Sequence, residues 1–294
     1  MKKSTGNKVV MVAAAGIAVV MMLVGCSSSK PAGTTAVEAT ADATTEAVAE
    51  TVTEAETTTA AAEETTILVA AAASLKYSYD EELIPMFVTA NPGIKVDATY
   101  DSSGKLQTQI EEGLGADVFM SAATKQMNAL KDENMVDADS IVNLLENKIV
   151  LIVPAGMDAK VTGFEDIANA DMIAIGDPES VPAGQYAKEA LTSLGLWDAV
   201  DAKSTKGTNV TEVLNWVAEG SADAGIVYAT DAATTDKVQV IAEAPEGSLA
   251  AKVIYPVGIV TASENQEAAQ KFVRFLQSDE AIAVFEKYGF SANE

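Results

Sequence analysis

Apolar residues along this chain form short runs that alternate with segments of helical periodicity. Short strands are predicted at 67–73, 94–100, 116–121, 172–176 and 224–228, of which 67–73 is a continuous apolar run. Apolar positions recur at helical spacing in 75–89, 105–112, 125–133, 183–193, 208–219, 265–277 and 280–287. This alternation of strands and helices predicts an α/β protein with parallel sheets.

Two longer apolar strands, 147–154 and 252–261, bracket the middle of the chain. This arrangement indicates that the chain leaves one α/β lobe, builds a second and then returns to the first. We therefore expect two lobes joined by two hinge-crossing strands, with a ligand cleft between them. The predicted division is 67–147 plus 256–294 for lobe I and 148–255 for lobe II.

The N-terminal segment has the pattern of an export signal. Lys2, Lys3 and Lys8 precede an apolar run from Val9 to Gly25, which is typical of a secretory signal peptide. The run ends in Leu23-Val24-Gly25-Cys26, which is similar to the bacterial lipobox. We expect a signal peptide over 1–25 and a lipid on Cys26. The alternative is an uncleaved membrane helix, for which the run is short.

Residues 26–66 differ from both flanking segments. They consist mainly of Ala, Thr, Glu and Val, contain no aromatic residue, and carry Lys30 as their single basic residue. Such a segment cannot bury enough apolar surface to offset its ordering entropy. We expect a disordered acidic tether between the lipid and the folded part.

Composition then narrows the chemistry. The formal net charge is −24 over 294 residues, which argues against a nucleic-acid partner, because phosphate backbones need clustered Lys and Arg. The absence of histidine excludes the Ser-His-Asp triad and His-ligated metal sites. Cys26 is the single cysteine, so no intramolecular disulfide can form. These totals leave a small anionic ligand possible.

The turns that follow the predicted strands offer neutral hydrogen-bond donors. They are 73–75, 101–104, 176–184, 207–210 and the end of the strand at Tyr228. In an open parallel sheet, ligands bind beyond the carboxyl ends of the strands, where helix N-termini also point. Helix N-termini carry unpaired N–H groups and partial positive charge, which suit anions. Taken singly, Ser74, Ser102 and Ser103 could be plain helix N-caps, which is the commonest role of serine at such positions.

Several stretches resemble one family across residues 67–291. They are Ala71-Ala72-Ala73-Ser74-Leu75, Ser102-Ser103, Ala116-Asp117-Val118-Phe119-Met120-Ser121-Ala122, the run Gly176–Leu191 (GDPESVPAGQYAKEAL), Gly225-Ile226-Val227-Tyr228, Tyr255-Pro256-Val257 and Lys287-Tyr288-Gly289-Phe290. Together they resemble the periplasmic molybdate-binding proteins of ABC importers. One departure is Gly104, where some members of that family have a third serine.

The resemblance implies a two-lobed α/β fold of the type II periplasmic-binding-protein kind. It implies a tetrahedral oxyanion ligand, molybdate or tungstate, with no cofactor and no enzymatic activity. The implied ligand groups are the hydroxyls and amides of Ser74 and Ser103, the amides of Ala183 and Val210, and the phenol of Tyr228. It further implies a monomer on the outer face of the bacterial cytoplasmic membrane, anchored through Cys26, with an ABC permease and its ATPase as partners.

Three other functions remain open at this point. The first is a receptor for another anion, such as sulfate or a small carboxylate. The second is an anchored hydrolase with Ser74 or Ser103 as the nucleophile and Lys76 or Lys105 as the base. The third is a structural or adhesive surface lipoprotein. For the oxyanion receptor, we expect capture to be nearly independent of pH while Tyr228 keeps its proton.

Overall fold

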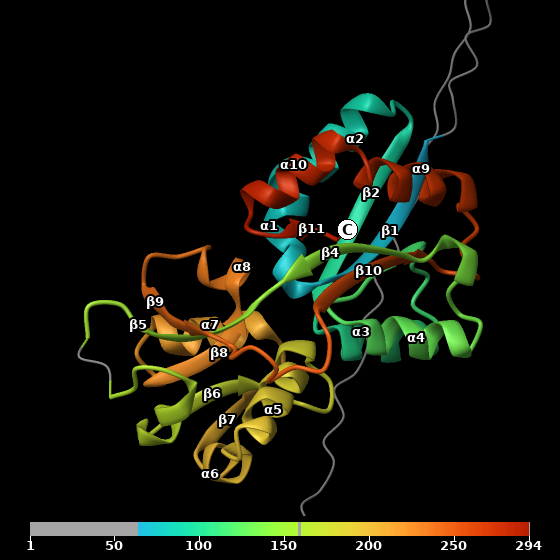
Figure 1. The fold of residues 1–294 in the computed structure, drawn as a ribbon. Helices are drawn as coiled ribbons and strands as arrows, with labels where there is room; N and C mark the ends of the chain where they lie inside the picture. Colours follow the sequence, from blue (N-terminus) through green and yellow to red (C-terminus); the bar gives the residue numbers. More distant parts are fainter. Residues whose placement is uncertain (1–63, 158–159, 294) are drawn as a thin grey trace, which may run out of the picture. The chain divides into compact units, whose positions relative to one another are not determined.

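The computed structural model describes residues 64–157 and 160–293, which belong to one compact unit. They form two α/β lobes, each built on its own sheet (Figure 1). The expected signal peptide, the lipid on Cys26 and the tether up to residue 63 lie outside the described residues. The last two residues of the expected tether, Thr65 and Thr66, begin the first strand.

Lobe I contains a mixed six-stranded sheet. Its order is β11 (Ser291–Ala292), β4 (Val142–Asn147), β10 (Val253–Ile259), β3 (Val118–Met120), β1 (Thr65–Ala72) and β2 (Ile94–Asp101). β1 runs parallel to β2 and β3, so the carboxyl ends of these three strands lie at the same edge. β10 runs antiparallel to both β3 and β4.

Helices cover both faces of this sheet. They are the helical stretch of η1 (Ala73–Leu75), α1 (Lys76–Ser78), a π turn (Tyr79–Leu83) and α2 (Ile84–Ala90), followed by α3 (Ser103–Glu111), α4 (Thr124–Asp132), α9 (Gln266–Leu276) and α10 (Asp279–Lys287). Successive side chains of a strand point to opposite faces of its sheet, so those of β1 contact both helix layers. Ile67 and Val69 pack in the cluster that contains Phe87 and Phe272, whereas Ala70 packs with the residues of α3 and α4.

Lobe II contains a five-stranded sheet in the order β7 (Ser204–Gly207), β6 (Ile173–Gly176), β8 (Ala224–Tyr228), β5 (Ile149–Pro154) and β9 (Val238–Glu243). Its helices are η4 (Phe164–Asn169), α5 (Pro182–Ser193), α6 (Trp197–Asp201), α7 (Val210–Ala218) and α8 (Ala229–Ala232). β6 is parallel to β7 and β8, so α5, α7 and α8 all begin at the same edge of the sheet.

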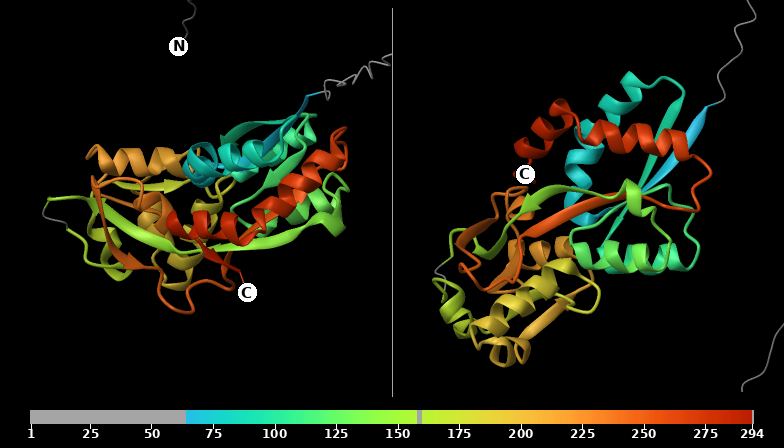
Figure 2. Two further views of the ribbon diagram at one scale, coloured as in Figure 1. Left: turned by 90° about the horizontal axis from the view of Figure 1, so that it is seen from above. Right: turned by 45° about the vertical axis from the view of Figure 1, so that its right-hand side comes forward.

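The chain passes between the lobes twice (Figures 1 and 2). β4 leads into β5 through Lys148 alone, and the segment 244–252 leads from β9 back to β10. β10 pairs with β4 on the lobe I side and has a bulge between Tyr255 and Pro256. A bulge is one of the few places where an interior strand tolerates proline, which cannot donate to the ladder.

The predicted two-lobed α/β fold with two crossing segments is confirmed. The apolar run 147–154, predicted as one strand, is divided, because Lys148 joins strands of different sheets. The prediction of parallel sheets was incomplete, since β5 and β10 run antiparallel to their neighbours. The pattern also missed β4, β7, β9 and β11. Three of these, β7, β9 and β11, are edge strands. β7 (Ser204–Gly207) contains no large apolar residue, β11 has only two residues, and β9 exposes Val240, so none of them shows the pattern of a buried strand.

Candidate functional site

A small cavity lies between the two lobes and is lined by the turns that follow β1, β2, β3 and β6, by the end of β8 and by the start of α7. Its lining is Ala72, Ala73, Ser74, Asp101, Ser102, Ser103, Ala122, Val181, Pro182, Ala183, Val210 and Tyr228. All five residues predicted from the sequence to hold a ligand are in this set. The volume open to the centre of a water molecule is about 10 Å³.

The hydroxyl of Ser74 is oriented by a chain of buried polar groups. The Asn147 side chain accepts the Lys148 N–H through Oδ1 (2.8 Å), which fixes its Nδ2 as a donor to the Tyr255 hydroxyl (3.2 Å). The Tyr255 hydroxyl lies 2.9 Å from Ser74 Oγ, and either hydroxyl can be the donor in this bond. With Tyr255 as the donor, the Ser74 O–H is free to donate into the cavity. The same Asn147 Nδ2 also donates to Thr230 Oγ1 at 2.9 Å.

Ser103 is held in an equivalent way on the same lobe. It is the first residue of α3, directly after β2, and it is fully buried. Its Oγ accepts the N–H of Ala122 at 2.9 Å, which again leaves the O–H as a donor. Since β1 and β2 are adjacent and parallel, the turns that carry Ser74 and Ser103 meet at one edge of the sheet.

Lobe II contributes two helix N-termini. Pro182 occupies the first position of α5 and has no N–H, so the amide of Ala183 is the first donor of that helix. Val210 is the first residue of α7, and Asn209 caps this helix by accepting the Glu212 N–H at 3.0 Å. The first N–H groups of a helix have no partner within it, so the amides of Ala183 and Val210 are available to an anion.

Tyr228 ends β8 and lies 1% exposed, with its ring 5.5 Å from that of Tyr255. Burial raises the pKa of the Tyr228 phenol well above its usual value, so the group stays protonated and can donate. Its hydroxyl donates to the carbonyl of Ala122 across the lobes at 3.3 Å, which is long for such a bond. A better acceptor in the cavity could therefore take this proton at little cost.

The structure adds Ser102 to the residues predicted from the sequence. Its side chain lines the cavity and is 3% exposed, and its Oγ has no hydrogen-bond partner among the residues that the structure describes. Burying a hydroxyl without a hydrogen-bond partner destabilises the fold by about 1–3 kcal/mol. A ligand oxygen in the cavity that accepts from Ser102 would remove this cost. The sequence places Ser102 in the correct turn, but the pattern alone cannot tell which of two adjacent serines faces the cavity.

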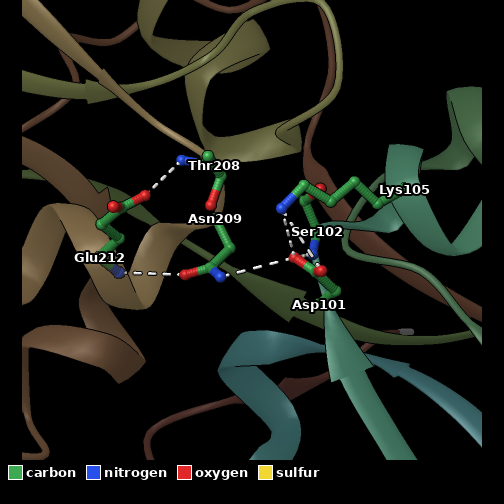
Figure 3. Close-up of polar contacts among 6 residues, drawn as sticks. All are labelled: Asp101, Ser102, Lys105, Thr208, Asn209 and Glu212. Carbon is green, nitrogen blue, oxygen red and sulfur yellow. Dashed lines mark hydrogen bonds and ion pairs between the residues drawn. The ribbon is translucent and has the colours of Figure 1, made fainter. Parts of the chain in front are cut away.

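Asp101 places a charge at the wall of the cavity, which the sequence analysis did not anticipate (Figure 3). Its carboxylate accepts the Ser102 N–H at 2.8 Å and pairs with Lys105 at 3.2 Å. It also accepts from Nδ2 of Asn209, in lobe II, at 3.4 Å. Asn209 therefore caps α7 with its oxygen and reaches across to lobe I with its nitrogen.

Further contacts join the lobes around the cavity. The N–H of Gly104 donates to the carbonyl of Ser180 at 2.9 Å, and Gln126 Nε2 donates to Gln185 Oε1 at 3.2 Å. Together with the Asp101–Asn209 bond, these contacts hold the two walls close together, which accounts for the small volume of the cavity.

The geometry disfavours a hydrolase. Lys76 pairs with Asp80 at 2.6 Å on the surface, and Lys105 pairs with Asp101, so neither amine contacts Ser74 or Ser103. Within 64–157 and 160–293, no group of acidic residues is placed to hold a metal ion. The site therefore provides hydrogen-bond donors around a small space, which is the chemistry of anion capture.

Comparison with known proteins gives the family. The profile of the bacterial extracellular solute-binding proteins matches residues 67–291. This chain belongs to that family. It is 43% identical to a candidate ABC transporter substrate-binding lipoprotein of Bacillus subtilis over 224 residues, which are 76% of this chain and 85% of the relative.

Two further relatives of this solute-binding protein point to one class of ligand. The molybdate-binding protein of Haemophilus influenzae is 38% identical over 232 residues, covering 76% of this chain and 89% of the relative. A solved substrate-binding domain from a candidate molybdenum ABC transporter of Clostridium difficile is 38% identical, with a TM-score of 0.61. That match covers 78% of this chain and 100% of the solved domain. Among the described residues of the solute-binding protein, no helix is long and apolar enough to cross a membrane.

Proposed function

We propose that this solute-binding protein captures molybdate or tungstate in the interlobe cavity and delivers it to an ABC permease and its ATPase. The observation that carries the proposal is that five residues with neutral donors, from four turns and a strand end, line one small cavity. They offer the hydroxyls and amides of Ser74 and Ser103, the amides of Ala183 and Val210, and the hydroxyl of Tyr228. The names of the relatives from Haemophilus influenzae and Clostridium difficile support the choice of ligand.

The donor set suits a tetrahedral dianion. Hydrogen bonds to a charged group contribute about 1.5–3 kcal/mol each, so five or more offset a large desolvation cost. The starts of α5 and α7 add partial positive charge without any titrating cation. Ser102 supplies a further hydroxyl from the wall of lobe I. The donors of Ser74 and Ser103 lie on lobe I and the other three on lobe II, so binding stabilises the closed arrangement of the lobes.

The rest of the proposal concerns cellular context. The lipobox-like sequence before Cys26 supports export and a lipid anchor on the outer face of the bacterial cytoplasmic membrane. Two or more acyl chains are needed for stable anchoring. The acidic segment 26–63 would then tether a monomeric receptor near its permease. Lys76 and Lys105 each form an ion pair with an aspartate, so neither is placed as a base for a serine nucleophile. This supports a binding role without catalysis.

Calorimetric titration of the full-length chain with molybdate, tungstate, sulfate and phosphate tests the proposal. We expect one-to-one binding of molybdate and tungstate and much weaker binding of the other two. Ser74→Ala is expected to weaken molybdate binding about 10-fold, from the loss of one charge-assisted bond. Ser204→Ala removes an exposed hydroxyl bonded to the Asp201 carbonyl and serves as the control. Absence of molybdate and tungstate binding contradicts the proposal.

A further inference from the structure

Two glutamine side chains meet between the lobes. Gln126 is the third residue of α4 in lobe I, and Gln185 is the fourth residue of α5 in lobe II (Figure 1). Gln126 Nε2 donates to Gln185 Oε1 at 3.2 Å. The Gln126 side chain is buried, and that of Gln185 is half-buried. Because the two residues belong to different lobes, their contact forms when the lobes close and is lost when they open.

The two side-chain amides form one hydrogen bond where their chemistry allows two. Each amide has an oxygen that accepts and a nitrogen that donates, so a pair of them can form two N–H···O bonds at once. Within 64–157 and 160–293, Gln126 Oε1 and Gln185 Nε2 are buried and have no hydrogen-bond partner. Rotating both amide groups by 180° would again give one bond, with one acceptor and one donor unpaired.

Incomplete pairing makes closure of the lobes less favourable at this contact. When the lobes are open, water can bond to both amides. Closure removes that water, gains one neutral hydrogen bond, and leaves one acceptor and one donor without a partner, which is a loss that a single neutral bond does not offset. A buried polar contact that is only partly paired is less stable than an apolar contact of the same shape.

Both glutamines follow residues of the cavity along the chain, but neither of them lines it. Gln126 lies four residues after Ala122, whose carbonyl accepts from the Tyr228 hydroxyl across the lobes. Gln185 lies two residues after Ala183, whose amide is one of the proposed ligand donors. The pair therefore affects the closed arrangement of the lobes without contacting the ligand, so it influences how long the cavity stays closed.

We propose that Gln126 and Gln185 set the rate at which the ligand is released, because closure of the lobes buries their amides only partly paired. The proposal rests on oxyanion capture in the same cavity. A ligand enclosed by two lobes leaves when they open, so an unfavourable contact in the closed state speeds release and weakens affinity. A receptor that delivers its ligand to a permease must also release it, and this pair limits the stability of the closed state.

Methionine variants of the full-length chain test the proposal, because methionine is unbranched, apolar and similar to glutamine in helix propensity. We expect Gln126→Met and Gln185→Met each to weaken molybdate binding about 3- to 10-fold, since the remaining amide loses its bond and stays buried. We expect the double variant to bind molybdate at least about threefold more tightly than the wild type, through slower release. Calorimetry measures the affinity, and loss of bound radioactive molybdate measures the release.

Gln107→Met is the matched control. Gln107 donates to Glu111 within α3 at 2.7 Å, so its amide bonds to a group of the same lobe. We expect this variant to bind and release molybdate as the wild type does. A double variant of Gln126 and Gln185 that releases molybdate no more slowly than the wild type overturns the proposal, because the pair would then only hold the lobes together.

Hydrogen exchange at one amide measures closure without relying on the ligand. The Gly104 N–H, near the start of α3, donates to the carbonyl of Ser180 in lobe II at 2.9 Å. The first N–H groups of a helix have no partner within it, so protection of this amide reports the closed population. We expect the double variant to protect it at least about threefold more than the wild type, with and without molybdate.

Equal protection of the Gly104 amide in the wild type and the double variant, in both conditions, overturns the proposal. If the wild type binds no oxyanion, the proposed function fails. Exchange in the ligand-free proteins then still decides whether Gln126 and Gln185 limit closure of the lobes.

Discussion

The hydroxyl of Tyr255 lies 2.9 Å from Ser74 Oγ, although 181 positions separate the two residues in the sequence. Tyr255 belongs to β10, the strand by which the chain re-enters lobe I, and Ser74 follows β1. Asn147 Nδ2 donates to the same Tyr255 hydroxyl at 3.2 Å. A residue of the returning strand thus forms a hydrogen bond with a hydroxyl that lines the cavity.

Tyr255→Phe is expected to weaken molybdate binding about 5- to 30-fold. The change leaves the Ser74 hydroxyl free to rotate and to donate elsewhere, which corresponds to a loss of about 1–2 kcal/mol. Titration calorimetry measures the affinity. Tyr79→Phe is the matched control, because Tyr79 is a fully buried phenol that donates to Met120 Sδ at 2.9 Å and does not line the cavity. Equal affinity losses in both variants would show that Tyr255 has no orienting role.

The acidic side chain at the cavity wall gives a prediction about charge. Asp101→Asn is expected to strengthen the binding of a dianion, because it removes a negative charge near the ligand and leaves Lys105 without its acidic partner. The effect is on the order of 1 kcal/mol at low salt, by Coulomb's law for charges a few ångströms apart in a water-like dielectric. It should shrink as ionic strength rises. Weaker binding at every salt concentration would mean that the bond from Asn209 to Asp101 matters more than the repulsion.

Asn209 caps α7 through its side-chain oxygen and donates to Asp101 through its side-chain nitrogen. A second cap variant, far from the cavity, shows how much of any change in binding comes from the loss of a helix cap alone. Asn209→Ala removes the cap of α7, which costs about 1 kcal/mol of folding stability, and also removes the bond to Asp101. We expect both a lower melting temperature and weaker molybdate binding. Ser278→Ala removes the cap of α10, where Ser278 accepts the Ala281 N–H at 3.3 Å, far in sequence from the cavity turns. This control should lower the melting temperature and leave the affinity unchanged.

Asp231 makes the binding of the ligand weakly dependent on pH. It is 4% exposed, and within 64–157 and 160–293 its Oδ2 has no hydrogen-bond partner. Burial raises its pKa from 3.8 to about 7. Its negative charge also contributes to the raised pKa of the Tyr228 phenol, so the two groups are close. Lowering the pH from 8 to 6 neutralises Asp231, which should modestly strengthen the binding of a dianion. Above pH 8, affinity should stay flat, because Tyr228 keeps its proton.

Asp231→Asn tests this account through both binding and stability. The variant should lose the rise in affinity between pH 8 and pH 6. Because the folded-state pKa is raised, folding is favoured most at low pH and loses this contribution as the pH rises from about 4 to about 7. The difference in melting temperature between the variant and the wild type should therefore favour the variant most above pH 7. A difference that does not vary with pH would contradict the raised pKa.

The turns that carry the proposed donors could be predicted because a strand followed by a helix is recognisable from local sequence, whereas the five residues themselves were implied by the family resemblance. Pro182 at a helix start and a serine directly after a strand both have the same meaning in any fold of this class. The groups that orient those donors could not be predicted in this way. Asn147 reaches Tyr255 across 108 positions, and the backbone of Gly104 meets Ser180 only because two lobes close on each other. Long-range contacts of this kind leave no periodic pattern in the sequence.

The central claim is that uncharged hydroxyl and amide groups from both lobes enclose a metal-oxide dianion. A co-crystal structure of the full-length chain with molybdate, located by the anomalous scattering of molybdenum, tests it most directly. We expect one molybdenum site in the cavity, with the molybdate oxygens within hydrogen-bonding distance of Ser74, Ser103, Ala183, Val210 and Tyr228. A molybdenum site elsewhere, or one held mainly by lysine side chains, would contradict it.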